Sequence, residues 1–304
     1  MNSLESLECD FNSQIEQLSK INNEKIFDGC VFVGSGDSYV AGLIAEYLTN
    51  HRCRCYSPSD LARSSFLRDN AYCFISVTGR TKANIDVAKR ARESGVKTIA
   101  LTLNQESDLA LTCNDVIPLK IAKINTPTAG FSTFLANVIT CLQITGIDVP
   151  NNFRSWFKDA VNFSSQSLKD NIMPVDNAHI LGNNLFYAIS LYTSFQMAEF
   201  FGSNFGAHKL EEFCHSPIFG LKKSHDVWIL GQNEEPISQK LEKLGFRTLY
   251  FELYNQDIIA QLFKSIFFVQ KLILLLARKC GYTELQYIVM KDVLKLSSEI
   301  IYAN

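Results

Sequence analysis

The chain has 304 residues, which is enough for about two domains of ordinary size. Hydrophobic residues make up 47% of the sequence and charged residues 20%, values typical of a folded globular protein, so a disordered or fibrous class is excluded. The formal net charge is −2, and the lysines and arginines are scattered, which argues against nucleic acid or an anionic membrane as the main partner.

The nine cysteines form no CxxC pair and no repeated metal-ligand spacing. Because several lie inside apolar strands, we interpret them as reduced core thiols of a cytoplasmic protein. Cys53 and Cys55 are the one close pair, and a metal site there is the alternative interpretation; we expect no metal. No leader pattern of charged and apolar residues opens the sequence. Polar residues at helical spacing interrupt the longest apolar stretch, residues 262–277, which favours a buried helix over a membrane span.

In the first half, predicted strands and helices alternate. Residues 30–35 are an apolar strand ending in a polar turn, and residues 39–48 then show helical periodicity. Further strands are predicted at 53–56, 72–77, 96–103 and 115–119, and helices at 82–94, 106–111 and 129–145. This alternation predicts a parallel sheet with helices on both faces.

The turn after the strand at 72–77 has the composition of a phosphate cradle. Ser76, Thr78 and Thr81 carry three hydroxyls, and the helix that begins near Lys82 points its positive end at the same turn. The segment contains no P-loop motif, so a small monophosphate is favoured over a nucleoside triphosphate. An ordinary strand-to-helix turn with a Ser/Thr cap is the alternative interpretation.

The second half, after the connection at 146–152, repeats this alternation of strands and helices. A helix is predicted at 153–169, followed by a strand at 179–182 and a helix through Phe200. Two more strands at 226–231 and 245–252 and a long helix at 258–279 complete the pattern. We interpret this as a tandem duplication of one α/β unit, with domains at 1–150 and 151–304. Glu234 and Glu235 occupy the turn that corresponds to the hydroxyl-rich one, so only the first half is expected to bind phosphate.

Three segments together resemble the sugar isomerase (SIS) family, in particular the isomerase domain of glucosamine-6-phosphate synthase and the archaeal two-domain phosphosugar isomerases. Residues 34–42, GSGDSYVAG, resemble the first turn of the family, G-[ST]-G-x-S-Y-x-A-G. Residues 75–81, ISVTGRT, resemble its phosphate loop, I-S-x-S-G-x-T. Residues 126–133, TPTAGFST, are similar to the helix start that closes the sugar pocket. The resemblance covers nearly the whole chain and implies two tandem SIS units, each a three-layer αβα sandwich.

The resemblance also implies the substrate contacts. Ser76, Thr78 and Thr81 would hold the sugar phosphate, Ser38 would touch the sugar chain, and Thr128 lies in the segment that closes the pocket. Arg80 stands where the family often carries Glu or Asn. It is either a solvated residue at the helix start or an additional phosphate contact.

The catalytic residues implied by the resemblance are Glu199, His215 and Lys295. The family places a glutamate on the first helix of the second half and a histidine sixteen positions later, and Glu199 and His215 keep that interval. Residues 215–217 read HSP where the family has HGP, and Gln196 replaces a lysine of the synthase. Lys295 lies in a segment, VLKLSS, that resembles the lysine-bearing tail. A solvated helix position for Glu199, a surface loop for His215 and an ordinary amphipathic helix for Lys295 are the alternatives.

These assignments imply a cofactor-free phosphosugar isomerase that interconverts an aldose and a ketose hexose 6-phosphate through a cis-enediol. The glycine pattern at 34–39 lacks the third glycine of a dinucleotide-binding fingerprint, so no such cofactor is expected. An isomerising glucosamine-6-phosphate deaminase, a non-catalytic sugar-phosphate sensor and an amine-transfer subunit fed by a separate glutaminase are the alternatives. The resemblance further implies a homodimer with a shared active site.

Overall fold

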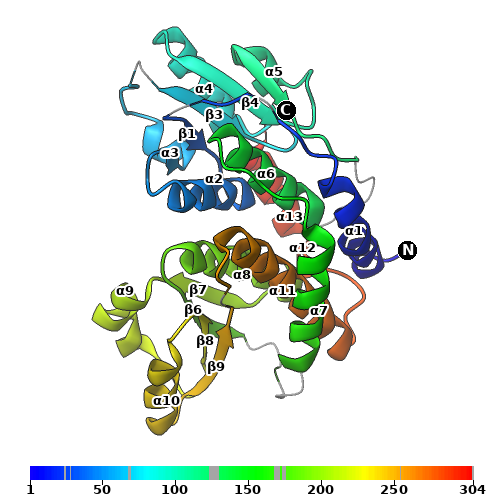
Figure 1. Cartoon of the computed structure of the whole chain (residues 1–304), viewed down its shortest axis with the longest axis vertical. Coiled ribbons are helices and arrows are strands. Elements are labelled where there is room, and N and C mark those ends of the chain that lie inside the picture. Colours follow the sequence, from blue (N-terminus) through cyan, green and yellow to red (C-terminus); the bar gives the residue numbers. More distant parts are fainter. Residues whose placement is uncertain are drawn as a thin grey trace. The chain divides into compact units, whose positions relative to one another are not determined.

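A computed structural model describes residues 1–23, 25–27, 29–67, 70–122, 130–167, 172, 176–253 and 255–302. The chain forms two compact units, each built on a parallel sheet with flanking helices (Figure 1). The N-terminal unit comprises Asn12–Asn151 with Lys291–Asn304, and the C-terminal unit comprises Asn152–Met290 with Met1–Phe11. Each unit thus combines most of one half of the sequence with a short segment from the opposite end of the chain, whereas the predicted domains, 1–150 and 151–304, are continuous.

The sheet of the N-terminal unit has the order β2-β1-β3-β4-β5, and every neighbouring pair is parallel. β3 is buried along its whole length, as expected of a strand covered on both faces. The strands of this sheet are β1 (Val31–Val33), β2 (Arg54–Tyr56), β3 (Ala71–Ile75), β4 (Lys97–Thr102) and β5 (Asp115–Pro118). The helices of this unit are α2 (Asp37–Leu48), α3 (Pro58–Leu61), α4 (Lys82–Glu93), α5 (Asp108–Thr112), α6 (Phe131–Ile144) and α13 (Lys291–Ile301), and α1 (Ser3–Leu18) is divided between the two units at Asn12.

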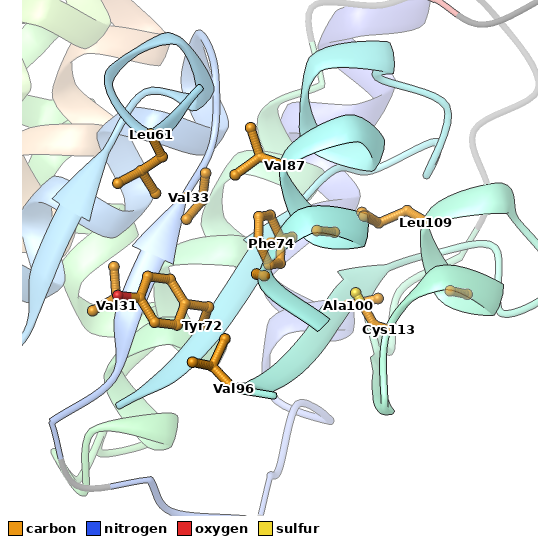
Figure 2. Packing of buried hydrophobic residues seen from close by; sticks show 13 residues of the cluster. Val31, Val33, Leu61, Tyr72, Phe74, Val87, Val96, Ala100, Leu109 and Cys113 are labelled. Carbon is orange, nitrogen blue, oxygen red and sulfur yellow. The ribbon is translucent and has the colours of Figure 1, made fainter. Parts of the chain in front are cut away.

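Successive side chains along these strands point to opposite faces of the sheet, and each face packs against its own layer of helices. Figure 2 shows Tyr72 and Phe74 of β3 packed with Val87 of α4 and Leu109 of α5. Residues with the opposite parity face α2, because a Cβ added at Gly42 would lie 2.8 Å from Cβ of Phe32. The predicted arrangement of helices on both faces of a parallel sheet is confirmed.

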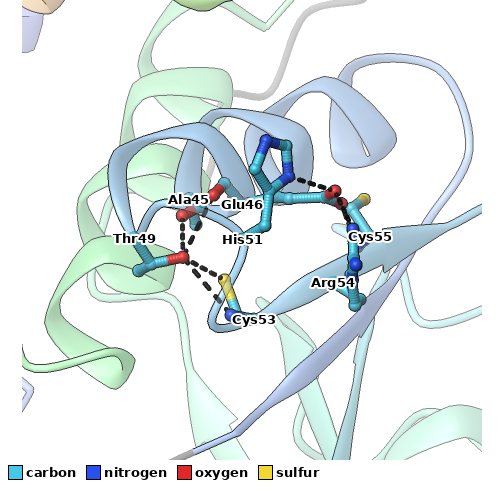
Figure 3. A network of polar contacts seen from close by, with 7 residues as sticks. All are labelled: Ala45, Glu46, Thr49, His51, Cys53, Arg54 and Cys55. Carbon is cyan, nitrogen blue, oxygen red and sulfur yellow. Dashed lines mark hydrogen bonds and ion pairs between the residues drawn. The ribbon is translucent and has the colours of Figure 1, made fainter.

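A buried carboxylate ties α2 to the edge strand β2 (Figure 3). Glu46 accepts hydrogen bonds from the backbone N–H of Cys55 at 2.7 Å and from Nη1 of Arg54 at 3.2 Å, and Nδ1 of His51 lies 2.9 Å from Oε1 of the same carboxylate. Three partners compensate this carboxylate for its removal from water. They fix α2, whose first turn carries the predicted sugar contact Ser38.

The neighbouring thiols take part in the same packing. Sγ of Cys53 lies 3.1 Å from the hydroxyl of Thr49, and Sγ of Cys55 donates to the carbonyl of Tyr39. Burial raises the pKa of Cys53 to about 11, so this thiol is protonated. Within the described ranges, no group of three or more His, Cys, Asp or Glu side chains is arranged to hold a metal ion.

The sheet of the C-terminal unit has the order β7-β6-β8-β9 and is also parallel throughout. Its strands are β6 (Asn177–Leu181), β7 (Asn204–His208), β8 (Asp226–Gly231) and β9 (Arg247–Glu252), and its helices are α7 (Phe153–Ser167), α8 (Leu185–Phe201), α9 (Leu210–His215), the 3₁₀ helix η2 (Pro217–Gly220), α10 (Glu235–Lys243), α11 (Ile258–Lys279) and α12 (Gln286–Val289). The sequence pattern missed β7, because its residues, NFGAH, combine a glycine with polar positions.

α11 is long and apolar enough to cross a membrane by length and composition, yet 72% of its apolar window is buried within the protein. It packs against α7 and α8, and the ring of Phe263 stacks on Trp156 of α7 with centroids 5.4 Å apart. This packing accounts for its apolar composition, as the sequence predicted, because a helix buried on most sides is hydrophobic on most sides.

Candidate functional site

The predicted phosphate loop lies at the point where the strand order of the first sheet reverses. From β1 the chain moves outward to β2 and then returns to add β3 on the other side of β1. In an open parallel sheet, the crevice outside the carboxyl ends of two such strands is the usual ligand site. Ser38 follows β1 and the turn 76–81 follows β3, so both lie at the carboxyl ends of these two neighbouring strands.

Within the turn, the hydroxyls are drawn together across the loop. Oγ of Ser76 lies 3.0 Å from Oγ1 of Thr81 and accepts a hydrogen bond from the N–H of Gly79 at 3.1 Å. Ser76 is buried, whereas Thr78 is exposed and accepts from the N–H of Arg80 at 3.3 Å. The turn thus presents one internal and one external hydroxyl, with Thr81 between them at the start of α4.

α4 begins at Lys82, as predicted, and the side chain of its N-cap residue Thr81 does not cap the helix. The hydroxyl of Thr81 is instead bonded to Ser76. This leaves the N-terminal N–H groups of a 12-residue helix directed at the turn without a side-chain cap. Such an end attracts anions through both its N–H groups and the helix dipole.

Gly79 gives the loop its tight form. Its φ is +67°, and a Cβ added there would lie 1.9 Å from Oγ of Ser107. Both the left-handed backbone and the lack of space strongly favour glycine at this position. The carbonyl of Gly79 also accepts from the N–H of Leu109, which anchors the loop to α5.

A contact that the sequence did not predict joins the loop to the segment after α13. Tyr302 forms an antiparallel bridge with Thr81, and its ring lies 5.5 Å from the guanidinium carbon of Arg80. Arg80 therefore stacks on an aromatic ring in this structure. Lys295 belongs to α13 in the same unit. Its side chain is 78% exposed and lies 4.0 Å from Glu299.

Glu199 lies near the end of α8 in the C-terminal unit. It is half-buried, and desolvation raises the pKa of its carboxyl to about 7. Tyr287 of α12, a helix that packs against α8, is affected by the same environment: burial and the charge of Glu199 raise the pKa of its phenol. A carboxyl with a pKa near neutrality is suited to exchange protons, and Tyr287 was not identified from the sequence.

His215 is the last residue of α9 and is strongly exposed. Nε2 of its ring lies 3.8 Å from Oε1 of Glu211, one helical turn earlier, and the side chain is 74% exposed. Glu199 and His215 thus have different neighbours in this chain, Tyr287 for Glu199 and Glu211 for His215. Ser38 is half-buried near the start of α2, and Thr128 lies outside the described residues.

The equivalent crevice of the second sheet, between β6 and β8, contains a carboxylate. Nδ2 of Asn183, just after β6, donates to Oε1 of Glu234 at 3.5 Å. Cγ of Glu234 also lies 2.9 Å from the position of a Cβ added at Gly231. A carboxylate at this position opposes the binding of a phosphate by like-charge repulsion. This arrangement supports the expectation of one phosphate site, in the first half.

Solved structures share this architecture over nearly the whole chain. Glucosamine-6-phosphate deaminase of Thermotoga maritima is 19% identical with a TM-score of 0.76, covering 93% of this chain and 96% of that one. The C-terminal domain of glucosamine-fructose-6-phosphate aminotransferase of Francisella tularensis is 15% identical with a TM-score of 0.68, covering 91% and 96%. Tagatose-6-phosphate ketose/aldose isomerase of Escherichia coli is 13% identical with a TM-score of 0.64, covering 92% and 89%. The α/β fold of the phosphosugar isomerases, and with it the predicted fold class, is confirmed.

The sequence resemblance extends to one curated relative. Over 135 residues the chain is 31% identical to glutamine--fructose-6-phosphate aminotransferase (isomerizing) of Pyrobaculum aerophilum. The match covers 40% of this chain and 22% of that protein. No family profile matches the chain. The resemblance to the isomerase domain of glucosamine-6-phosphate synthase therefore has support from both sequence and fold.

Proposed function

We propose that this protein is an aldose-ketose isomerase that acts on a hexose 6-phosphate in the cytoplasm. The observation that carries the proposal is the turn at 76–81, where hydroxyls and an uncapped helix end converge at the strand-order reversal of the sheet. A phosphate dianion matches this combination of hydroxyl and N–H donors. Ser76, Thr78 and Thr81 bind the phosphate, and Ser38 contacts the sugar chain.

The isomerisation requires one group that moves a proton between two carbons. In the direction from ketose to aldose, a base removes a proton from C1, giving a cis-enediol, and returns a proton to C2. Glu199 is suited to this task because a carboxyl with a pKa of about 7 is partly ionised at neutral pH and readily reprotonated. His215 opens the sugar ring, and Lys295 stabilises the enediolate charge.

A homodimer with a shared active site accounts for the exposure of His215. A ring that is 74% exposed on its own chain is available to the pocket of a second chain. We propose that each site combines Glu199 of one chain with His215 of the partner chain.

An isomerising deaminase is the second candidate, because a structure sharing the fold over 93% of this chain is described as a glucosamine-6-phosphate deaminase. Such a reaction would form fructose 6-phosphate and ammonia from glucosamine 6-phosphate and water, with the proton moving from C2 to C1. Parallel assays decide between the two. Release of ammonia from glucosamine 6-phosphate would favour the deaminase, and interconversion of fructose 6-phosphate with glucose or mannose 6-phosphate would favour the isomerase.

A solvent-exchange experiment separates both enzymes from a sensor that only binds sugar phosphate. The protein is incubated with fructose 6-phosphate in D₂O, and deuterium at C1 is measured by mass spectrometry. An isomerase incorporates deuterium because the proton that Glu199 removes from C1 exchanges with D₂O. A deuteron is then returned to C1 when the enediol reverts to the ketose. Binding with a thermal shift but no deuterium at C1 would refute the enzyme assignment.

A further inference from the structure

Three of the five histidines of the chain gather on one face of the C-terminal sheet. Nδ1 of His179 in β6 lies 3.1 Å from Nε2 of His208 at the end of β7. The ring of His225, just before β8, has its centroid 5.6 Å from that of His179. Its Nδ1 is buried and has no hydrogen-bond partner among the described residues.

The strand register explains this convergence. His179 is paired with Gly206 of β7 and with Val227 of β8, so His208 and His225, each two residues from a partner of His179, face the same side of the sheet. Gly206 provides the space that His208 needs, because a Cβ added there would lie 2.8 Å from Nε2 of His208. The close imidazole pair thus depends on a glycine at this position.

α9 covers the pair through a single aromatic side chain. The ring centroid of Phe213 lies 5.4 Å from that of His179 and 5.6 Å from that of His208, and Phe213 is 1% exposed. Phe213 is two residues before His215 on this six-residue helix. Phe213 also packs in a buried apolar cluster with Leu181, Val227, Ile229 and Leu241, so the imidazole pair forms one part of the contact on which α9, and with it His215, is seated.

The charged groups near the cluster are directed elsewhere. Glu211 and Glu212 on α9 are exposed, and Asp226, which follows His225, faces the other side of the sheet and pairs with Arg247 at 3.0 Å. The nearby lysines also stack elsewhere, with Lys209 over Tyr187 and Lys223 over Phe246.

Protonation of His179 or His208 is therefore unfavourable while α9 lies against the sheet. Burial and the neighbouring imidazoles lower the pKa of His179 to about 4, and burial lowers the pKa of His208.

We propose that His179 and His208 are positioning residues that hold α9 in place when neutral and release it when protonated. The hydrogen bond between the two rings requires a proton on one nitrogen and a lone pair on the other. One further proton, taken up by the second nitrogen of the donor ring, leaves this bond intact but buries a positive charge beneath Phe213, and a second would place two N–H groups face to face 3.1 Å apart. Acid therefore favours a state in which the pair separates and α9 lifts from the sheet. The consequence for catalysis rests on the proposed function, since it concerns the position of His215.

The size of the effect follows from proton linkage. If His179 titrates near 4 when α9 is seated and near 6.5 when it is lifted, lowering the pH from 7.5 to 5 raises the opening equilibrium about 30-fold. Hydrogen exchange measures this opening directly, because local unfolding of a short surface helix exchanges its amides without global unfolding.

Hydrogen exchange of the full-length protein between pH 7.5 and 5 tests the proposal. After correction for the intrinsic exchange rate, the amides of α9, including the Phe213 N–H bonded to Lys209, are expected to lose protection by about 30-fold on acidification, while β8 keeps its protection. His179→Gln should remove most of this dependence, and His208→Gln serves if the first variant does not fold. His51→Gln, which removes a histidine from the other unit, is the control and should behave as wild type.

Two outcomes would overturn the proposal: α9 protection in the wild type that does not change with pH, or an equal change in His179→Gln.

The pH profile of isomerisation, measured on the same proteins, tests the link to catalysis. Below the titration of Glu199 near pH 7, kcat/KM should fall more steeply with acid in the wild type than in His179→Gln, with little difference between them at pH 8. Acid-dependent opening without any isomerase activity would refute the proposed function and leave the seating role intact. Isomerase activity with pH-independent exchange of α9 would refute the seating role alone.

Discussion

Glu199 and His179 are two partly buried titratable groups in the same unit whose pKa values move in opposite senses. Desolvation raises the pKa of the Glu199 carboxyl to about 7 and contributes to lowering that of the His179 imidazole to about 4. In both cases burial disfavours the charged form. At neutral pH the imidazole is therefore uncharged, while the carboxyl is divided between its two forms.

Replacing Glu199 by glutamine should abolish most of the activity. General acid–base catalysis contributes on the order of 10²- to 10⁴-fold, so kcat is expected to fall within that range while the thermal shift with fructose 6-phosphate persists. In the wild type, kcat/KM should rise with pH through about 7, because only the ionised carboxyl acts as a base. Glu93→Gln, at the exposed end of α4, is the matched control. Activity of Glu199→Gln within tenfold of wild type would contradict the role.

The same carboxyl should reduce stability at alkaline pH. Its pKa in the folded protein lies above the ordinary value of 4.5, so between pH 4.5 and 7 the folded state binds more protons than the unfolded state. The contribution of Glu199 to stability is therefore greatest below pH 4.5 and declines as pH rises to 7. Glu199→Gln should gain stability on the order of 1–3 kcal/mol at pH 8, and much less at pH 5, in urea denaturation. An equal effect at both pH values would contradict this linkage.

The turn between β3 and α4 gains its form from the backbone as much as from its hydroxyls. Two constraints apply at Gly79: its φ is left-handed at +67°, and a Cβ added there would collide with the side chain of Ser107. At Gly95, just beyond the other end of α4, only the first applies, because φ is +80° and no atom lies within 4 Å of an added Cβ. The two positions allow strain and steric conflict to be separated.

Gly79→Ala should therefore be more harmful than Gly95→Ala. We expect Gly95→Ala to cost about 1 kcal/mol of unfolding free energy and to leave ligand binding unchanged. Gly79→Ala should cost about 1–3 kcal/mol more and weaken the binding of fructose 6-phosphate at least tenfold, because the loop must shift away from Ser107. Urea denaturation and calorimetric titration measure the two effects. Equal ligand affinity in both variants would argue against this turn as the phosphate site.

The pattern of apolar segments predicted the parallel architecture, and three features show where such prediction ends. β7 was missed because NFGAH has neither alternation nor β-branched residues. Tyr302 and the histidine cluster depend on contacts between residues far apart in the chain, which local periodicity does not encode. Ser76 and Thr81, five residues apart, could be found because their contact is local. Glu199 was predicted from the resemblance to the family motif. Its neighbour Tyr287 was not predicted, because the two are brought together by the packing of α12 on α8.

Across the whole protein, the proposed shared site makes a quantitative prediction for mixed chains. Glu199→Gln and His215→Asn should each be nearly inactive alone. If Glu199 and His215 of one site come from different chains, half of the dimers formed after mixing and refolding contain both variants, and each of these has one intact site. Activity should return to about a quarter of the wild-type value. No recovery in a mixture proven to exchange chains would mean that each site is built within one chain.

Each unit is completed by a segment from the opposite end of the sequence, and this has a consequence for how the protein folds during synthesis. Residues 12–151 leave the ribosome first but must wait for about 140 further residues before Lys291–Asn304 can join them. At 5–20 residues per second, this delay is roughly 7–28 s. During that interval, Thr81 lacks its bridge to Tyr302. The nascent first half is therefore expected to depend on chaperones or on slow translation more than a unit encoded by one uninterrupted segment.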